Sequence, residues 1–310
     1  MFSFVENDYY YGKLPQQEMP LLLDLYQNKG VAALKAYLNT HKLRGRRVLL
    51  NSFRANHADG RFLLALDLTS VVLDLGCGFG TLAIPIAKVC KEVFAVDATF
   101  ERVQFLAQRV ECEDLANIIP IHASVWDLPF SKSSFDCIVM NGVLEWVGEW
   151  LADRSPREVQ LKALERCREL LKPSGTLFVA IENRIGFEFL YRSRDPHSKL
   201  YFTSLLPRKL ASVVTRLLKH KSYRTYTYTR RGYQRLFRQA GYSHLEFYCP
   251  WPRYQDPRYI SRWGEVAAAR YFRKTVLRAQ RFDEYVFCSG LARLGLDWLF
   301  SPSFIILAQK

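Results

Sequence analysis

Several features that would assign this 310-residue chain to a familiar class are missing from its sequence. No uninterrupted apolar run reaches the roughly 18 residues of a membrane-spanning helix, so no span is expected. Residues 1–11 contain acids and tyrosines where a secretion signal has basic residues and an apolar run, so no signal is expected. The seven cysteines are scattered and form no C-x-x-C pair, which predicts reduced thiols, no disulfide framework and no metal site. These absences together predict a cytoplasmic protein.

Acidic residues are scarce in the second half of the chain. Residues 184–281 contain 22 Lys and Arg but only 5 Asp and Glu, while the whole chain has a formal net charge of +14. A segment this basic can meet nucleic acid, anionic lipid or a phosphorylated substrate. It can equally be an ordinary solvated surface, so charge alone leaves the partner open.

What the sequence does contain is a short apolar run that leads into three glycines. Val71–Leu75 is typical of a buried parallel strand. Gly76, Gly78 and Gly80 follow at alternate positions, and a helix-like stretch, 81–89, comes next. A glycine turn between strand and helix lets a ligand approach the backbone and directs helix N–H groups at it. The spacing differs from the G-x-G-x-x-G of dinucleotide binders.

Strands and helices alternate after this turn, which is the pattern of an α/β fold. The sequence predicts a Rossmann-like, seven-stranded, mostly parallel sheet whose last strand is antiparallel. We expect residues 68–310 to form this domain, with insertions at 184–229 and 250–302. Residues 1–67 are expected to form an N-terminal helical cap, either over the site or over one edge of the sheet. The further strands are expected at 93–96, 118–122, 135–140, 176–181, 245–248 and 303–308, and the helices at 19–26, 30–38, 81–90, 100–110, 155–171 and 230–240.

Polar residues stand where the predicted strands end. Parallel α/β sheets bind ligands at the carboxyl ends of their strands. Asp97 ends the second strand, 19 positions after Gly78, where a carboxylate can accept both hydroxyls of a ribose. The alternative is that Asp97 only caps the following helix. Asn141 ends the fourth strand and Glu182 the fifth, so these side chains are expected to face the ligand.

The segment around these residues resembles the class I S-adenosylmethionine (SAM) dependent methyltransferases. It is most similar to methyltransferase family 11, the ubiquinone/menaquinone methyltransferase-like group. The likeness rests on the acid-ended strand with its glycine turn, on Asp97, and on Leu128-Pro129-Phe130 followed by Ser134-Phe135-Asp136. It covers about 68–183 well and the closing strands loosely. Ala123-Ser124 departs from the Gly-Asp of the family, so Ser124 would hold the adenine amino group less strongly than a carboxylate.

The resemblance implies a transferase that binds SAM and catalyses methylation. The implied SAM-binding residues are Asp74, Gly76, Cys77, Gly78, Gly80, Asp97, Ala98, Ser124, Val125, Trp126 and Asn141. Trp126 could instead be ordinary core. Methyl transfer needs a general base only when the acceptor is a hydroxyl or a carbon acid. Candidates for that base are Glu145, Glu182 and, from the first insertion, His197, although Glu182 could instead form a surface ion pair with Arg184.

The acceptor is predicted from a softer resemblance. Ile181–Gly186, Tyr223–Tyr228 and Trp251–Tyr254 look like segments of bacterial methyltransferases associated with surface-glycan and secondary-metabolite genes. They imply a small-molecule or glycan-type acceptor, including phosphorylated or lipid-linked ones. Two alternatives stay open: an RNA methyltransferase that binds nucleic acid through the basic half, and a non-catalytic SAM-fold binding protein.

Two stretches of the first insertion have patterns with more than one interpretation. In 205–219 the apolar residues fall on one helical face and the basic residues largely elsewhere. Such a helix can lie on an anionic membrane surface, which would make the protein peripheral to the membrane, or it can pack on its own domain. In 223–229 alternating Tyr and Thr predict an extended segment, which either lines a cleft or forms a plain edge strand.

Overall fold

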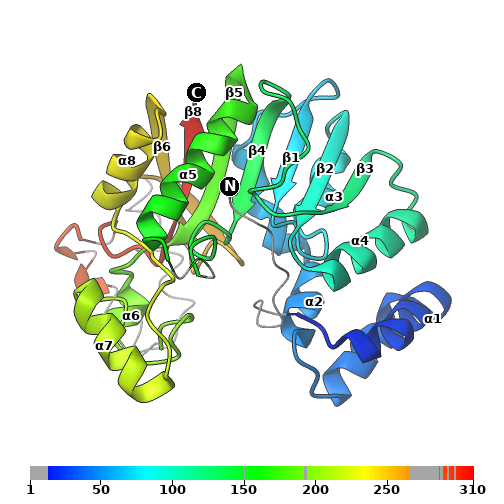
Figure 1. Cartoon of the computed structure of the whole chain (residues 1–310), viewed down its shortest axis with the longest axis horizontal. Coiled ribbons are helices and arrows are strands. Elements are labelled where there is room, and N and C mark those ends of the chain that lie inside the picture. The colour runs from blue at the N-terminus through cyan, green and yellow to red at the C-terminus, as the bar shows by residue number, and fades with distance from the viewer. Residues whose placement is uncertain are drawn as a thin grey trace. The chain divides into compact units, whose positions relative to one another are not determined.

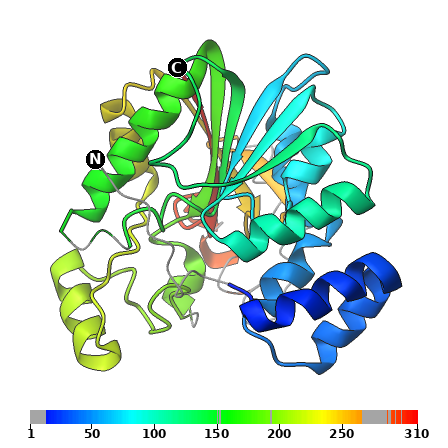
Figure 2. The same cartoon turned by 45° about the vertical axis from the view of Figure 1, so that its right-hand side comes forward.

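The structure is a computed structural model and describes residues 13–149, 151, 153–191, 194–265, 286, 289–291, 293–296 and 298–310. The chain divides into two compact units. The first contains residues 1–140 with 170–175, and the second contains residues 141–169 with 176–310. Figure 1 labels most of the helices and strands of both units, and Figure 2 shows them from a second direction.

The first unit begins with helices. These are η1 (Gln16–Glu18), α1 (Met19–Thr40), α2 (Arg46–Ser52) and η2 (Ala55–Leu63). Gly30 interrupts α1 with a φ of 78°, a conformation that suits glycine. The helices expected at 19–26 and 30–38 are therefore the two halves of α1. The α1 helix lies alongside α4 (Figure 2).

The strands of the first unit form a parallel sheet in the order β3-β2-β1-β4. Along the chain they and their helices are β1 (Val71–Leu75), α3 (Ala83–Ala87), β2 (Glu92–Asp97), α4 (Phe100–Cys112), β3 (Ile118–His122) and β4 (Phe135–Asn141). Val72 to Leu75 of β1 are all buried, as expected for a central parallel strand. The α3 helix is shorter than the predicted 81–90, because the glycine turn continues as turn structure through Leu82.

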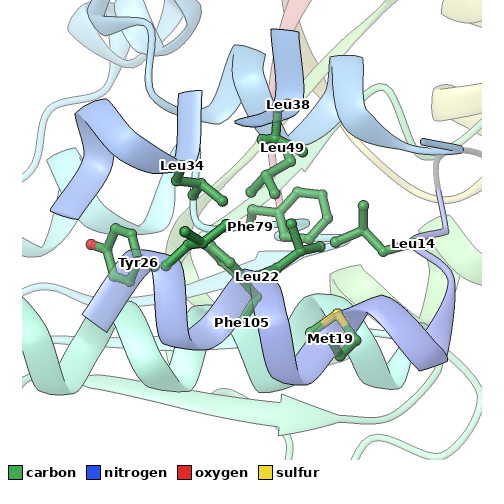
Figure 3. Close-up of a cluster of buried hydrophobic side chains, with 10 residues drawn as sticks. Leu14, Met19, Leu22, Tyr26, Leu34, Leu38, Leu49, Phe79 and Phe105 are labelled. Atoms are coloured by element: carbon green, nitrogen blue, oxygen red, sulfur yellow. The ribbon is translucent and has the colours of Figure 1, made fainter. Parts of the chain in front are cut away.

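A cluster of buried apolar side chains joins the N-terminal helices to the glycine turn. Figure 3 shows Leu22, Leu34 and Leu38 of α1 gathered with Phe105 of α4 and Phe79, which lies between Gly78 and Gly80. The rings of Phe79 and Phe105 meet edge to face, with centroids 5.7 Å apart. The predicted cap thus packs against the turn itself and against α4.

Replacing Phe79 with alanine is expected to lower the free energy of unfolding by about 3–5 kcal/mol, the usual cost of emptying a fully buried Phe site. Urea unfolding followed by circular dichroism measures this loss. Phe62→Ala is the matched control, because Phe62 is 72% exposed and its removal should cost under about 1 kcal/mol. Equal losses for the two variants would contradict the assigned packing.

The second unit has the strand order β5-β8-β6-β7. Its elements are α5 (Pro156–Leu170), β5 (Leu171–Glu182), α6 (Phe187–Tyr191), α7 (Arg208–Lys219), α8 (Arg230–Gln239), β6 (His244–Trp251), β7 (Tyr259–Arg262) and β8 (Ser303–Gln309). The last residue of α5 and the first five of β5 are grouped with the first unit. The last strand, β8, is antiparallel to both β5 and β6. Thr229 caps α8 through its side chain, which accepts a hydrogen bond from Gly232 N.

The predicted α/β fold with an antiparallel last strand is confirmed, with one strand more than the seven expected. The additional strand, β7, lies in the 250–302 insertion and pairs with β6. Most of that insertion, including Cys288, lies outside the described residues, and the other six cysteines are free thiols. In the described part of the chain, no helix is long and apolar enough to cross a membrane.

Candidate functional site

The glycine turn is fixed to the end of β2 by backbone hydrogen bonds. Gly76 N and Cys77 N both donate to Val96 O, at 2.7 and 3.0 Å. Gly76, Gly78 and Gly80 all have positive φ angles, which L-residues with side chains rarely adopt. The predicted spacing therefore reflects three left-handed positions in one turn.

Gly80 and Gly78 differ in what lies next to them. A Cβ added to Gly80 would lie 2.6 Å from Leu106 Cδ1, so this position allows α4 to approach the turn closely. A Cβ added to Gly78 would meet no atom within 4 Å. Gly78 therefore borders open space, and this is the side on which a ligand can approach the backbone.

Asp97 holds the turn and the start of α4 together. Its Oδ2 accepts a hydrogen bond from Gly78 N at 2.9 Å and lies 3.4 Å from an Arg102 guanidinium nitrogen. Its Oδ1 accepts from Thr99 N, also at 2.9 Å. Thr99 is the N-cap residue of α4 but makes no side-chain capping bond, so Asp97 does bind the helix start. A carboxylate oxygen has two lone pairs, so Oδ1 keeps capacity for a ligand hydroxyl.

Asp74 is buried at the end of β1, beneath the same turn. Burial raises its pKa to about 7, and the nearby Asp97 adds to this, while a hydrogen bond from Ala83 N opposes it. Its Oδ2 has no hydrogen-bond partner among the described residues. Near neutral pH this carboxyl group therefore exists in both protonation states.

This pKa predicts that the free protein loses stability as the pH rises from about 4 to about 7. In that range the folded protein keeps a proton on Asp74 that the unfolded chain, with an ordinary Asp pKa near 3.8, has released. The loss is at most about 4 kcal/mol. Urea midpoints measured across this range should fall less steeply in Asp74→Asn.

Asp67→Asn is the matched control. Hydrogen bonds from Thr69 lower the pKa of Asp67, so the contribution of Asp67 to stability increases as the pH rises. If Asp74→Asn and the unmodified protein had the same pH slope, the assigned pKa of Asp74 would be wrong.

The loop after β3 is attached to Asp97. Ala123 N donates to Asp97 O at 3.2 Å. Ser124 Oγ accepts a hydrogen bond from Trp126 N and donates to Asp127 Oδ2, so the hydroxyl expected to meet adenine also stabilises its own turn. Val125 is buried and Trp126 is half-buried.

Ala98 is half-buried directly after β2, and its carbonyl lies 3.3 Å from His122 Nε2. The structure thus brings Ala98, Ser124, Val125 and Trp126 together with the glycine turn around Asp97 in the first unit. Asn141 closes β4, is half-buried, and is grouped with the second unit.

A second group of titratable side chains lies in the second unit. Glu145 is buried, and within the described residues neither of its carboxylate oxygens makes a hydrogen bond of good geometry. Burial raises its pKa well above the usual value, and the charge of Glu182 raises it further. Glu182, at the end of β5, is also buried. The two carboxyl groups therefore interact, and burial favours the protonated form of Glu145.

His197 adds an imidazole to this pair. Its Nε2 lies 3.9 Å from Glu182 Oε2, and its ring meets Trp146 edge to face with centroids 4.9 Å apart. The backbone that carries His197 is fixed, because Asp195 Oδ1 accepts from His197 N at 2.8 Å and Asp195 Oδ2 accepts from the Tyr223 hydroxyl at 2.7 Å. The three residues predicted as candidate bases thus form one cluster.

Aromatic residues that were not predicted as site residues complete the cluster. The Tyr254 hydroxyl donates to Glu182 Oε1 at 3.3 Å, and the Tyr233 hydroxyl donates to Glu182 O at 2.9 Å. Gly142 follows β4 with a φ of 69°, and a Cβ there would collide with the Tyr254 hydroxyl. The sequence signal for Tyr254 was the segment Trp251–Tyr254, which supported the prediction of the acceptor but gave Tyr254 no role of its own.

Comparison with known families finds a match for the segment that contains the glycine turn and Asp97. The profile of a family described as a methyltransferase domain matches residues 73–179, which include the glycine turn, Asp97 and the loop after β3. Residues 73–179 form a class I SAM-dependent methyltransferase domain.

Curated relatives of this methyltransferase domain cover part of the chain. The ubiquinone biosynthesis O-methyltransferase of Xanthomonas campestris pv. campestris is 30% identical over 173 residues, which are 53% of this chain and 66% of that protein. An uncharacterized protein of Rickettsia prowazekii is 28% identical over 141 residues, which are 44% of this chain and 53% of that protein. The chain spans between about half and two thirds of the length of these relatives.

Solved structures share the fold of this chain. A SAM-dependent methyltransferase from Thermotoga maritima has a TM-score of 0.50 at 14% identity, covering 89% of this chain and 97% of that one. A chain from the complex of the Haloferax volcanii Trm112 methyltransferase activator with a methyltransferase has a TM-score of 0.50 at 16% identity, covering 89% and 96%. At this identity the likeness shows the fold alone.

Several basic residues of the second unit are used inside the protein. Arg184 donates to Ser204 O and Leu206 O, both at 2.7 Å, so it does not form the ion pair with Glu182 that was one interpretation. Arg224 donates to the carbonyl groups of Gly148, Leu151 and Arg154.

Arg208 lies over the rings of Tyr226 and Tyr228, at 4.3 and 5.6 Å from their centroids. The alternating segment 223–229 is packed, with Tyr223, Thr225 and Thr227 buried, and it forms only an isolated bridge between Tyr228 and Asn183. Part of the positive charge of this half therefore holds loops in place. Among the described residues, no group of three His, Cys, Asp or Glu side chains could hold a metal ion.

Proposed function

We propose that this chain is a SAM-dependent methyltransferase whose acceptor carries a hydroxyl group on a small molecule or glycan-type substrate. The observation that carries the proposal is the buried pair Glu145 and Glu182 with His197 beside it. A buried carboxyl pair in which one member keeps its proton is a suitable device for accepting a proton from a substrate.

The first unit fits the donor. SAM supplies a methyl group on a sulfonium, which is already a good leaving group. Asp97 Oδ1 retains a lone pair for a ribose hydroxyl, and the open space beside Gly78 admits a ligand to the backbone. Since the leaving group is good, the task of these residues is to hold the donor in a productive orientation.

The second unit fits an acceptor that loses a proton. Glu182 accepts hydrogen bonds from Tyr254 and Gln255, which are donors that stabilise a carboxylate. Glu145, kept protonated by burial and by Glu182, can donate a hydrogen bond. His197 lies against Glu182 Oε2, so a proton taken by Glu182 has an imidazole close by. Glu182 would therefore act as the base.

Two observations support the proposed type of acceptor. The relative from Xanthomonas campestris is named an O-methyltransferase of ubiquinone biosynthesis, which favours an oxygen acceptor. Aromatic side chains around Glu182, with Trp146 on His197, favour a ring-shaped acceptor such as a sugar or a quinol. Phosphorylated and lipid-linked forms of such acceptors belong to the same proposal.

RNA methylation is less favoured, because Arg184, Arg208 and Arg224 donate to backbone carbonyls of their own chain. A non-catalytic role is less favoured as well, because a binding protein has no use for a buried carboxyl pair. We further propose a cytoplasmic location.

The test is a mass-shift screen. Purified protein is incubated with SAM and separate panels of glycans, lipid-linked sugars, quinols and RNA, and the products are examined for a gain of one methyl group. Methylation of a hydroxyl in the first three panels supports the proposal. Methylation of RNA alone, or no binding of SAM in calorimetry, would contradict it.

A further inference from the structure

One helix of the second unit exposes its apolar side chains. In α7, Leu210, Val213, Leu217 and Leu218 are between 47% and 73% exposed, and the buried residues are Ala211 and Thr215. For these four residues, the interpretation in which the amphipathic helix packs its apolar face on its own domain therefore does not hold. We call these four residues the α7 apolar face. Figure 1 shows α7 at the periphery of its unit, away from the strands β5, β6 and β8.

The opposite side of α7 explains why the apolar face points outward. Ala211 and Thr215 are one turn apart and share the buried side. Ser212 Oγ donates to Tyr223 O at 3.4 Å, and Arg208 stacks on Tyr226, so small and basic residues attach the helix to the segment 223–229. These contacts attach α7 through small and basic side chains, while Val214 on the same helix is half-buried.

Basic residues lie beside the α7 apolar face and at the C-terminal end of the helix. Lys209, Arg216, Lys219, His220 and Lys221 are all exposed, on the helix or directly after it. Residues 196–245 contain eleven Lys and Arg and no Asp or Glu. A surface that combines exposed Leu and Val with neighbouring basic residues matches the apolar interior and anionic head groups of a lipid surface.

We propose that the α7 apolar face docks on an anionic membrane surface. The leucines and Val213 enter the boundary between head groups and acyl chains, while Lys209, Arg216 and Lys219 contact lipid phosphates. This interaction is separate from methyl transfer, because α7 contributes no residue to the Glu145 and Glu182 cluster.

The experiment is vesicle co-sedimentation of the full chain. Vesicles of phosphatidylcholine alone and of an equimolar mixture with phosphatidylglycerol are compared at low and high salt. We expect binding to the mixed vesicles, weakened at high salt as screening shortens the reach of surface charges. Leu217→Glu with Leu218→Glu should reduce this binding by about tenfold or more, because two apolar groups no longer enter the lipid.

Leu68→Glu with Leu294→Glu is the matched control. These leucines are 77% and 73% exposed, the charge change is the same, and neither lies on α7. The control should bind within about twofold of the unmodified protein, as expected for sites outside the interface. Lys209→Glu with Arg216→Glu should also lose about tenfold or more, since each basic residue near an anionic surface contributes about fivefold or more.

Three results would overturn the proposal. One is equal binding to neutral and mixed vesicles. Another is equal loss of binding in the α7 variant and the control. The third is light scattering that shows a dimer broken by Leu217→Glu, which would assign the α7 apolar face to a second copy of the chain. Circular dichroism and SAM calorimetry verify that each variant is folded.

Discussion

Asp97→Ala is expected to weaken SAM binding by about 100-fold or more. The substitution removes the carboxylate proposed to accept the ribose hydroxyls, and hydrogen bonds to a charged group contribute about 1.5–3 kcal/mol each. It also frees Gly78 N and Thr99 N, which Asp97 now holds at 2.9 Å. Isothermal titration calorimetry with SAM measures the change in affinity.

Asp97→Asn separates these two contributions. The asparagine side chain keeps one acceptor oxygen but loses the negative charge and the second acceptor. We expect an intermediate loss of affinity, with a melting temperature closer to that of the unmodified protein. If folded Asp97→Ala bound SAM as tightly as the unmodified protein does, the ribose assignment would be wrong.

Glu182→Gln is expected to reduce the rate of methyl transfer by about 100-fold or more, with SAM affinity unchanged. A general base of this kind contributes about 10²–10⁴-fold to the rate. The measurement is single-turnover transfer from SAM to an acceptor found in the screen, in parallel with calorimetry of SAM. A fall in both quantities would indicate a structural role instead.

For Glu145→Gln we expect a much smaller effect on the rate of methyl transfer. Because Glu145 keeps its proton, a neutral glutamine of the same size should preserve most of the rate, and less than about tenfold should be lost. Glu246→Gln is the control for removing a carboxylate outside the cluster, on β6, and should leave the rate unchanged. If Glu145→Gln were as slow as Glu182→Gln, the assignment of the proton to Glu145 would have to be reversed.

Local sequence patterns predicted most of the fold. Val71–Leu75 became β1 because a run of apolar residues suits a strand with both faces covered. The helix expected at 155–171 is α5 (Pro156–Leu170), and proline fits its first helical position. The resemblance predicted SAM as cofactor, and the match of 73–179 to the methyltransferase domain supports it.

Patterns that depend on distant contacts were harder to interpret. The apolar face of α7 was visible in the sequence, but whether it is covered depends on what packs beside it. Tyr254 was missed because its role arises from a contact with Glu182, 72 positions earlier. The strand β7 was missed because four residues within a long insertion make too short a pattern to distinguish from a loop.

Phe79 links the stability of the glycine turn to that of the N-terminal helices α1 and α2. The residue sits inside the glycine turn, while its ring belongs to the core of the N-terminal helices. Any ligand that binds the folded turn and not the unfolded chain stabilises everything that unfolds with it. Occupancy of the donor site is therefore thermodynamically linked to the order of α1 and α2, although these helices contain none of the residues assigned to SAM.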